Sequence, residues 1–129
     1  MKTQIIEYRD DEYDVVITVK QATLADGLRR QAKIAEMVET LKKEEAQGET
    51  RSLIERFAIL RLFPECTIGT ANIENRDANK KQLSTEMSIA DFLELPEALV
   101  VMWQTAIYAC NPQWILKMEG EAQEPGKKN

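Results

Sequence analysis

Histidine is absent from the 129 residues of this sequence, and only two cysteines, Cys66 and Cys110, are present. Without histidine the chain lacks the usual general base, the Ser-His-Asp and Cys-His pairs and every metal site that uses an imidazole. Two cysteines far apart in the sequence form no CxxC motif and are too few for a structural zinc site. Both lie in apolar stretches, which favours buried, reduced thiols over a disulfide.

The sequence also lacks a basic excess and a long hydrophobic run. Its formal net charge is −5 and its basic pairs are interleaved with acids, so we expect no binding to nucleic acid. No stretch approaches the roughly 18 apolar residues of a membrane span, and the first residues lack the apolar core of a signal peptide. We therefore expect a cytoplasmic protein with no membrane contact.

The pattern of apolar residues predicts an α+β fold, mainly α, in which an N-terminal β-hairpin packs on a small bundle of about four helices. One globular domain is expected over residues 1–118, with the hairpin at 4–20 and the helical body at 23–116. The tail at 119–129 has no apolar anchor and is expected to be disordered. Residues 64–87 stay open, because they either add a short strand or order only on a partner.

The hairpin has a regular alternation in its second strand, which predicts one buried face. The residues of that face are Tyr13, Val15, Ile17 and Val19. The turn before it, DDEYD at residues 10–14, gathers carboxylates but lacks the spacing of a calcium loop, so a solvated turn is favoured over a metal site. No cofactor-binding or catalytic motif is present, and no such residue is assigned. An alternative hydrolase would be built around Asp10, Asp11 and Asp14.

Capping residues mark three helix starts, at Thr23, Ser52 and Ser88. The first helix, about 24–46, is expected to bury an apolar stripe against the rest of the chain. That stripe consists of Leu24, Leu28, Ala35 and Val38, with Ala32 beside it and with Ile34 and Leu41 on its flank. The second helix is expected to end before Pro64, because proline disfavours helical backbone at the preceding residue.

The second helix, LIERFAILRLF at residues 53–63, also shows an amphipathic pattern. We expect Leu53, Phe57 and Leu60 to be buried and Arg61 to face water. Its apolar side would then join the core that the hairpin needs, since a lone hairpin is marginally stable in water.

The segment PEALVVMWQTAIYACNP, residues 96–112, predicts a helix with an apolar arc of roughly 180°. Most of this arc is expected to be core. For Val101, Tyr108 and Trp114 an interface is favoured, because large apolar groups on the wetter side of a helix mark binding surfaces. The candidate protein-interface residues are Leu99, Val101, Trp103, Ile107, Tyr108 and Trp114. The hypothesis is that the apolar side chains near the carboxyl end outnumber what one copy buries.

Three phrases in this order are similar to a known family. They are QATLADGLRRQAKIAEM (21–37), ERFAILRLFPECT (55–67) and SIADFLELPEALVVMWQTAIYACNPQW (88–114), which follow a strand pair. Over residues 13–116 the chain resembles the tail assembly chaperones of long-tailed bacteriophages, in which a short β-element precedes a helical body and a phrase of the form dFl-LPe…W…a…NP-W follows.

The resemblance implies a non-enzymatic, cytoplasmic protein of a phage or prophage. Such proteins bind the tape measure protein, keep its hydrophobic helices soluble and help to recruit the tail tube protein. They also self-associate, so a homo-oligomer is expected. The alternatives are a structural connector that remains in the virion and the carboxylate-dependent hydrolase described above.

Overall fold

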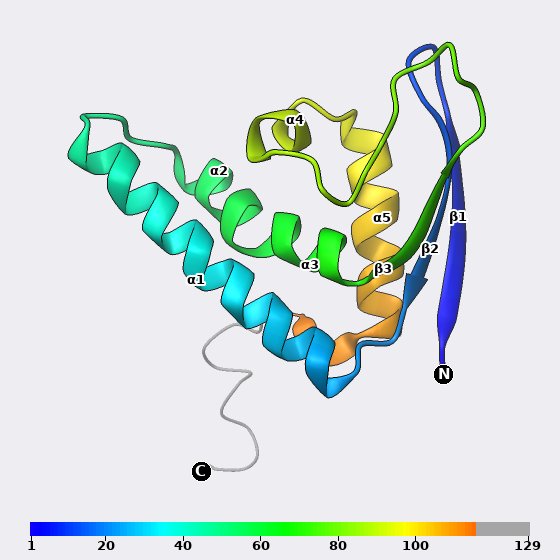
Figure 1. Cartoon of the computed structure of the whole chain (residues 1–129), viewed down its shortest axis with the longest axis horizontal. Coiled ribbons are helices and arrows are strands. Elements are labelled where there is room, and N and C mark those ends of the chain that lie inside the picture. Colours follow the sequence, from blue (N-terminus) through cyan, green and yellow to red (C-terminus); the bar gives the residue numbers. More distant parts are fainter. Residues whose placement is uncertain (116–129) are drawn as a thin grey trace.

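A computed structural model of the chain describes residues 1–115 and contains a three-stranded antiparallel sheet with the helices on one side of it (Figure 1). This confirms the α+β, mainly α fold class. Its elements are β1 (Thr3–Arg9), β2 (Asp14–Lys20), α1 (Leu24–Ala46), α2 (Leu53–Phe57), a π-helical turn (Ala58–Leu62), α3 (Phe63–Ile68), β3 (Thr70–Asn75), α4 (Ile89–Leu93), α5 (Glu97–Cys110) and a 3-10 turn (Pro112–Trp114).

Two further predictions concern the carboxyl-terminal tail and the passage of a helix through a membrane. The predicted tail at 119–129 lies outside the described residues. Within residues 1–115, each helix is too short or too polar to pass through a bilayer.

β2 is the central strand, with β1 and β3 antiparallel on its two sides. β1 and β2 form the predicted hairpin in continuous register. For residues 64–87 the strand interpretation is correct, because β3 pairs with β2 and places Ile73 opposite Ile17. The loop after β3 is tied to the hairpin turn, where the Lys81 N–H donates to the Glu12 carbonyl at 2.8 Å.

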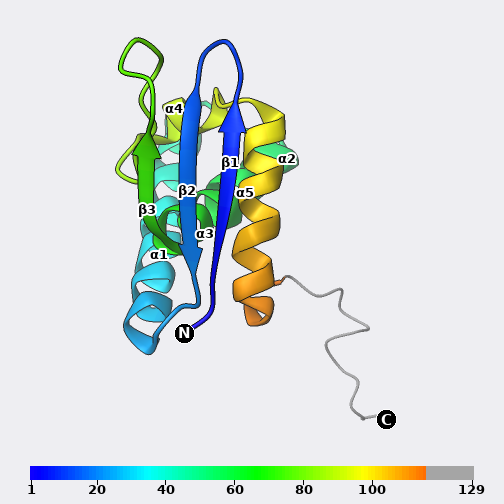
Figure 2. The same ribbon diagram turned by 90° about the vertical axis from the view of Figure 1, so that its right-hand side faces the viewer.

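The core lies between the sheet and the helices, with α5 packed on β1 and β2 at the β1 side of the sheet (Figure 2). The predicted buried face of the hairpin is confirmed, with each of its four side chains at most 8% exposed. Leu99, Trp103 and Ile107 on α5 are fully buried, each contributing about 1.5–3 kcal/mol of gross stabilisation. The Trp103 indole N–H donates to Thr70 Oγ1 at 2.8 Å, so its polar atom is satisfied inside the core.

The start of α1 follows the predicted capping box. Thr23 Oγ1 accepts from the Asp26 N–H at 3.2 Å, and Asp26 Oδ2 accepts from the Thr23 N–H at 2.9 Å. The predicted buried stripe, in contrast, is wrong, because Leu24 is 81% exposed and Leu28 is 58% exposed. The fully buried side chains of α1 are Asp26, Met37 and Leu41.

Polar interactions explain why α1 buries a different side from the predicted one. Asp26 accepts hydrogen bonds from Lys20 and Arg29, and Arg30 donates to Glu65 of α3, so this side of the helix points inward with its polar groups paired. A buried polar group that is fully hydrogen-bonded carries little penalty. Apolar periodicity alone does not detect such a face.

The second helix continues past Pro64, so the predicted end is wrong. The Phe63 N–H donates to the Ala58 carbonyl, five residues back, which is a π-helical bond. This wider turn lies directly before Pro64, whose ring would otherwise press on the Leu60 carbonyl in a regular α-helix. The helix then runs on as α3 to Ile68.

The ends of the last two helices follow local signals. Ser88 Oγ caps α4 by accepting from the Asp91 N–H at 3.1 Å, as predicted. Pro96 is the N-cap of α5 rather than its first helical residue. Asn111 ends α5 and is fully buried.

Asn111 also fixes α5 to the connection between β2 and α1. Its Nδ2 donates to the Lys20 carbonyl at 2.9 Å and to the Ile107 carbonyl at 3.1 Å, and its Oδ1 accepts from the Ala22 N–H at 2.7 Å. One amide therefore satisfies backbone groups of three segments.

Candidate functional site

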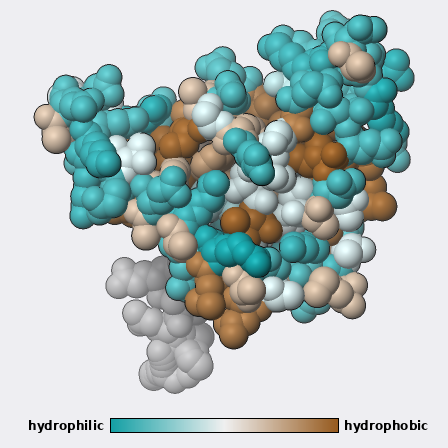
Figure 3. All heavy atoms as spheres, viewed as in Figure 1, coloured by the Kyte–Doolittle hydropathy of each residue, from teal (hydrophilic) through white to brown (hydrophobic). Residues whose placement is uncertain are grey.

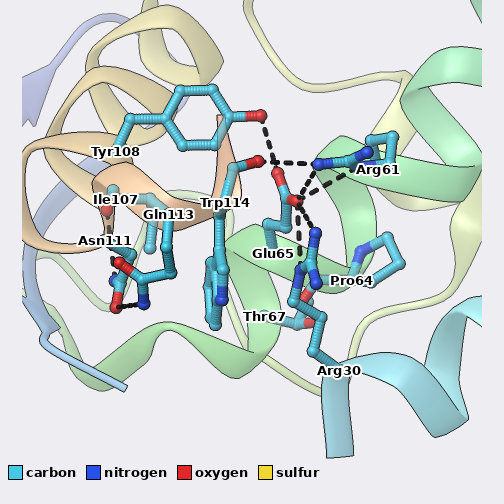
Figure 4. Close-up of polar contacts among 10 residues, drawn as sticks. All are labelled: Arg30, Arg61, Pro64, Glu65, Thr67, Ile107, Tyr108, Asn111, Gln113 and Trp114. Carbon is cyan, nitrogen blue, oxygen red and sulfur yellow. Dashed lines mark hydrogen bonds and ion pairs between the residues drawn. The ribbon is translucent and has the colours of Figure 1, made fainter. Parts of the chain in front are cut away.

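Glu65 is a carboxylate inside the helical layer, with 1% of its surface exposed (Figure 4). Its Oε2 accepts from Arg30 at 2.6 Å (Nη2) and 3.1 Å (Nε), and from Arg61 at 3.0 Å (Nη2) and 3.1 Å (Nε). Its Oε1 accepts from the Tyr108 hydroxyl at 2.7 Å. The buried carboxylate is thus hydrogen-bonded on both oxygens, and the two arginines on Oε2 balance its charge.

Four segments bring these groups together. Arg30 comes from α1, Arg61 from the π-helical turn, Glu65 from α3 and Tyr108 from α5. Arg61 Nη2 also donates to the Trp114 carbonyl at 2.7 Å, and the Arg30 guanidinium lies 4.9 Å from the centre of the Trp114 ring. The cluster therefore joins α1, the π-helical turn, α3, α5 and the 3-10 turn.

This cluster connects the helices rigidly and has a structural role. Arginine stays protonated in proteins, so neither guanidinium exchanges a proton with a substrate. Burial, followed by the hydrogen bond to Glu65, raises the pKa of Tyr108 to about 12, which keeps its hydroxyl a neutral donor. Every polar side-chain atom of Glu65 is occupied within the fold, so the cluster holds the helices in place.

Sequence reasoning missed Glu65 and placed Arg61 toward water, which is wrong. The signal was present: Glu65 follows Arg61 by four residues inside the apolar run LRLFPEC, so both lie on one helix face. A charged pair inside such a run indicates a buried ion pair.

The predicted interface residues lie mainly in the core. Leu99, Trp103 and Ile107 are fully buried, and Trp114 is 5% exposed. Tyr108 is half-buried against Glu65, whereas Val101 is 51% exposed. The sheet and the neighbouring helices therefore cover four of the six, and only Val101 presents most of its side chain to the surface.

The carboxylates of the acidic hairpin turn bind separate partners and do not converge on one point. Asp10 accepts from the Tyr8 hydroxyl at 2.6 Å and from two backbone N–H groups of the turn, each at 2.7 Å. The Tyr8 hydrogen bond lowers the pKa of Asp10 below its ordinary value. Asp14 instead pairs with Arg76 at 3.1 Å. In the part of the chain that the structure describes, no three acidic or cysteine side chains are grouped to hold a metal ion.

Cys66 and Cys110 are both free and at most 2% exposed, which confirms the expected buried thiols. Burial raises the pKa of the Cys66 thiol far above its ordinary value. Because the thiolate is the reactive form, this cysteine is a packing residue in the fold.

The largest departure from the sequence prediction is an apolar surface on the outside of α1. Its members share one side of the helix and are all exposed. We call Leu24, Leu28, Ala32 and Ala35 the outer α1 face. Figure 3 shows hydrophobic surface at the lower edge of the molecule, where α1 begins. A separate apolar pair, Leu53 and Ile54, is 83% exposed at the start of α2, so the predicted burial of Leu53 is wrong.

Comparison with known proteins gives no relative for this chain. No protein-family model, no curated protein and no solved structure matches it. The function is therefore argued from the geometry above and from the sequence resemblance.

Proposed function

We propose that this protein is a non-enzymatic assembly chaperone that binds another polypeptide through the outer α1 face. The observation that carries the proposal is the exposure of Leu24 (81%) and Leu28 (58%) on a helix whose opposite side is held in the core. Exposed apolar patches on folded proteins mark binding surfaces. Burying each leucine against a partner would contribute about 1.5–3 kcal/mol.

The shape of this face favours a helical partner. Ala32 and Ala35 continue the stripe with small side chains, which lets the side chains of a second helix approach the α1 backbone. An amphipathic helix that lays its apolar side along a groove or stripe is a common mode of peptide recognition. The resemblance to phage tail assembly chaperones supplies the client: the helices of a tape measure protein, with the tail tube protein recruited later, in the cytoplasm of the host.

The interior supports this role by fixing α1. Arg30 and Asp26 place two ion-pairing groups on its inner side, and each is hydrogen-bonded to another segment. A face that is already in position loses little conformational entropy when a partner binds. We expect self-association, which the resemblance also implies, to use the same face and to compete with the client.

Co-expression with fragments of a phage tape measure protein tests the function. We expect a fragment that is insoluble alone to enter the soluble fraction and to co-purify with the chain. Fragments that cover the whole tape measure protein and all remain in the pellet would contradict the proposal.

The structural connector makes a different prediction for finished particles. A chaperone leaves the tail, so mass spectrometry of purified particles should find this chain only at trace level. Stoichiometric copies in the particle would support the connector instead.

A further inference from the structure

β1 leaves one edge of the sheet open. The strand order β1-β2-β3 places β1 at the edge, and Figure 2 shows α5 rather than another strand beyond it. The Gln21 N–H donates to the Lys2 carbonyl at one end of the pair. With the continuous register, this bond sets which β1 residues pair with β2. The residues that direct their N–H and C=O groups away from β2 are Thr3, Ile5, Glu7 and Arg9.

This edge lacks two of the features that protect edge strands, although Glu7 and Arg9 place charged side chains on it. β1 has neither a proline nor a bulge, and Ile5 at its centre is 62% exposed. The opposite edge differs, because β3 carries an irregularity opposite Thr18 and Val19. The Asn75 side chain of β3 also bonds both backbone groups of Leu83 in the following loop.

α5 reaches beyond β1 on the inner side of the sheet. The Lys2 ammonium donates to the Ala109 carbonyl at 2.8 Å, which places the end of α5 beside the start of β1. The flank of α5 on this side is exposed, and Met102 is its only large residue, at 39%. The other residues of the flank are Ala98, Thr105 and Ala109. Because these side chains are small, the backbone of an added strand has room to lie over the helix.

We propose that an extended segment of a partner polypeptide adds to β1 as a fourth strand and covers this flank of α5. Its backbone would pair with the free groups of Ile5 and Glu7, and its alternate apolar side chains would pack on Met102. A second copy that pairs through its own β1 is the competing occupant, and the concentration dependence of amide protection distinguishes the two. The site is separate from the outer α1 face and does not depend on the identity of the client.

Amide hydrogen exchange, followed by NMR on the full chain, tests the open edge first. The amides of Ile5 and Glu7 should exchange about a hundredfold faster than those of Ile6 and Tyr8, which pair with β2. Equal protection of all four at low protein concentration would mean that the chain already covers its own edge. Protection that grows with concentration would mean that a second copy pairs there. Either result would overturn the proposal.

A tethered probe tests the added strand. A segment of roughly eight alternating valine and threonine residues, placed before Met1 through a Gly/Ser linker of about five residues, would meet β1 at millimolar effective concentration. We expect about tenfold or slower exchange at Ile5 and Glu7 and a shift of the Met102 methyl signal. The matched control has prolines in place of the threonines and should change neither.

Ile5→Pro supplies a second control, because it removes an N–H that makes no bond to β2 and so spares the hairpin ladder. It should abolish the probe's effect at Glu7, whereas Ile5→Thr should retain it. If Ile5→Pro unfolds the hairpin, Met102→Glu on the α5 flank replaces it and should weaken the protection. Unchanged exchange at Ile5 and Glu7 with the valine-threonine extension would overturn the proposal.

Discussion

The Arg30 Nη2 and Glu65 Oε2 atoms lie 2.6 Å apart and join α1 to α3 inside the helical layer. The two side chains are 14% and 1% exposed, so the pair is shielded from solvent on the carboxylate side. Arg61 and Tyr108 complete the coordination of the same carboxylate. This pairing explains why α1 turns a partly polar side inward and leaves its leucines outside.

Glu65→Gln should destabilise the fold strongly. The substitution keeps the shape but leaves Arg30 and Arg61 without their counter-charge, which costs about 3–5 kcal/mol for a buried pair. Urea unfolding followed by circular dichroism measures the loss. The exposed residue Glu74 provides the matched control, because Glu74→Gln should change the unfolding free energy by less than about 0.5 kcal/mol.

Tyr108 should make the stability depend on alkaline pH. Its pKa is raised from 10.0 to about 12 in the folded chain, so its contribution is complete below pH 10 and is lost as the pH rises to about 12. Thermal unfolding of the wild type and Tyr108→Phe over this range measures the difference. The slope of stability against pH should be shallower for Tyr108→Phe, and equal slopes would contradict the assignment.

Asn111→Ala should cost about 1–3 kcal/mol, because it leaves partly buried backbone groups of Lys20 and Ala22 without partners. The neighbouring Gln113 is exposed and contacts Asn111 Oδ1 only at the long distance of 3.5 Å, so it serves as the control. Gln113→Ala should lower the denaturation midpoint by little, and a comparable loss for both variants would show that the amide network is not specific.

Two glycines should respond in opposite directions to alanine. A Cβ on Gly69 would lie 2.7 Å from Ile107 Cδ1 and 2.9 Å from the Glu65 carbonyl, so Gly69→Ala should cost about 1–3 kcal/mol. A Cβ on Gly27 of α1 would meet no atom within 4 Å, so Gly27→Ala should stabilise the helix by about 0.5–1 kcal/mol. Differential scanning calorimetry of the two variants should show shifts of opposite sign.

Local signals predicted much of the fold. The capping boxes at Thr23 and Ser52 and the alternation of β2 gave the starts of two helices and the buried side of the hairpin, because these depend on residues close in sequence. The buried face of α1 depends on Glu65, which lies 35 residues from Arg30, so periodicity within the helix did not reveal it. The π-helical turn before Pro64 was not predicted either. The rule that a helix ends before proline does not allow for a wider turn that accommodates the ring.

The candidate site was predicted less well than the fold. The apolar helix near the carboxyl end was assigned an excess of hydrophobic surface, yet the third strand and α3 help to cover it, with Trp103 bonded to Thr70. The stripe of Leu24 and Leu28 was found by its spacing but assigned to the core. Which of two apolar stripes is buried depends on the partners that the fold brings, and sequence spacing does not contain that information.

The proposed function depends most directly on the outer α1 face. The decisive measurement is the fraction of a tape measure fragment that stays soluble when co-expressed with Leu24→Gln/Leu28→Gln, compared with Leu53→Gln/Ile54→Gln. Both double variants change exposed leucine or isoleucine side chains, so their own folding should be unaffected within about 0.5 kcal/mol. The α1 variant should lose the fragment to the pellet while the α2 variant keeps it soluble. Full solubility with the α1 variant would contradict binding through this face.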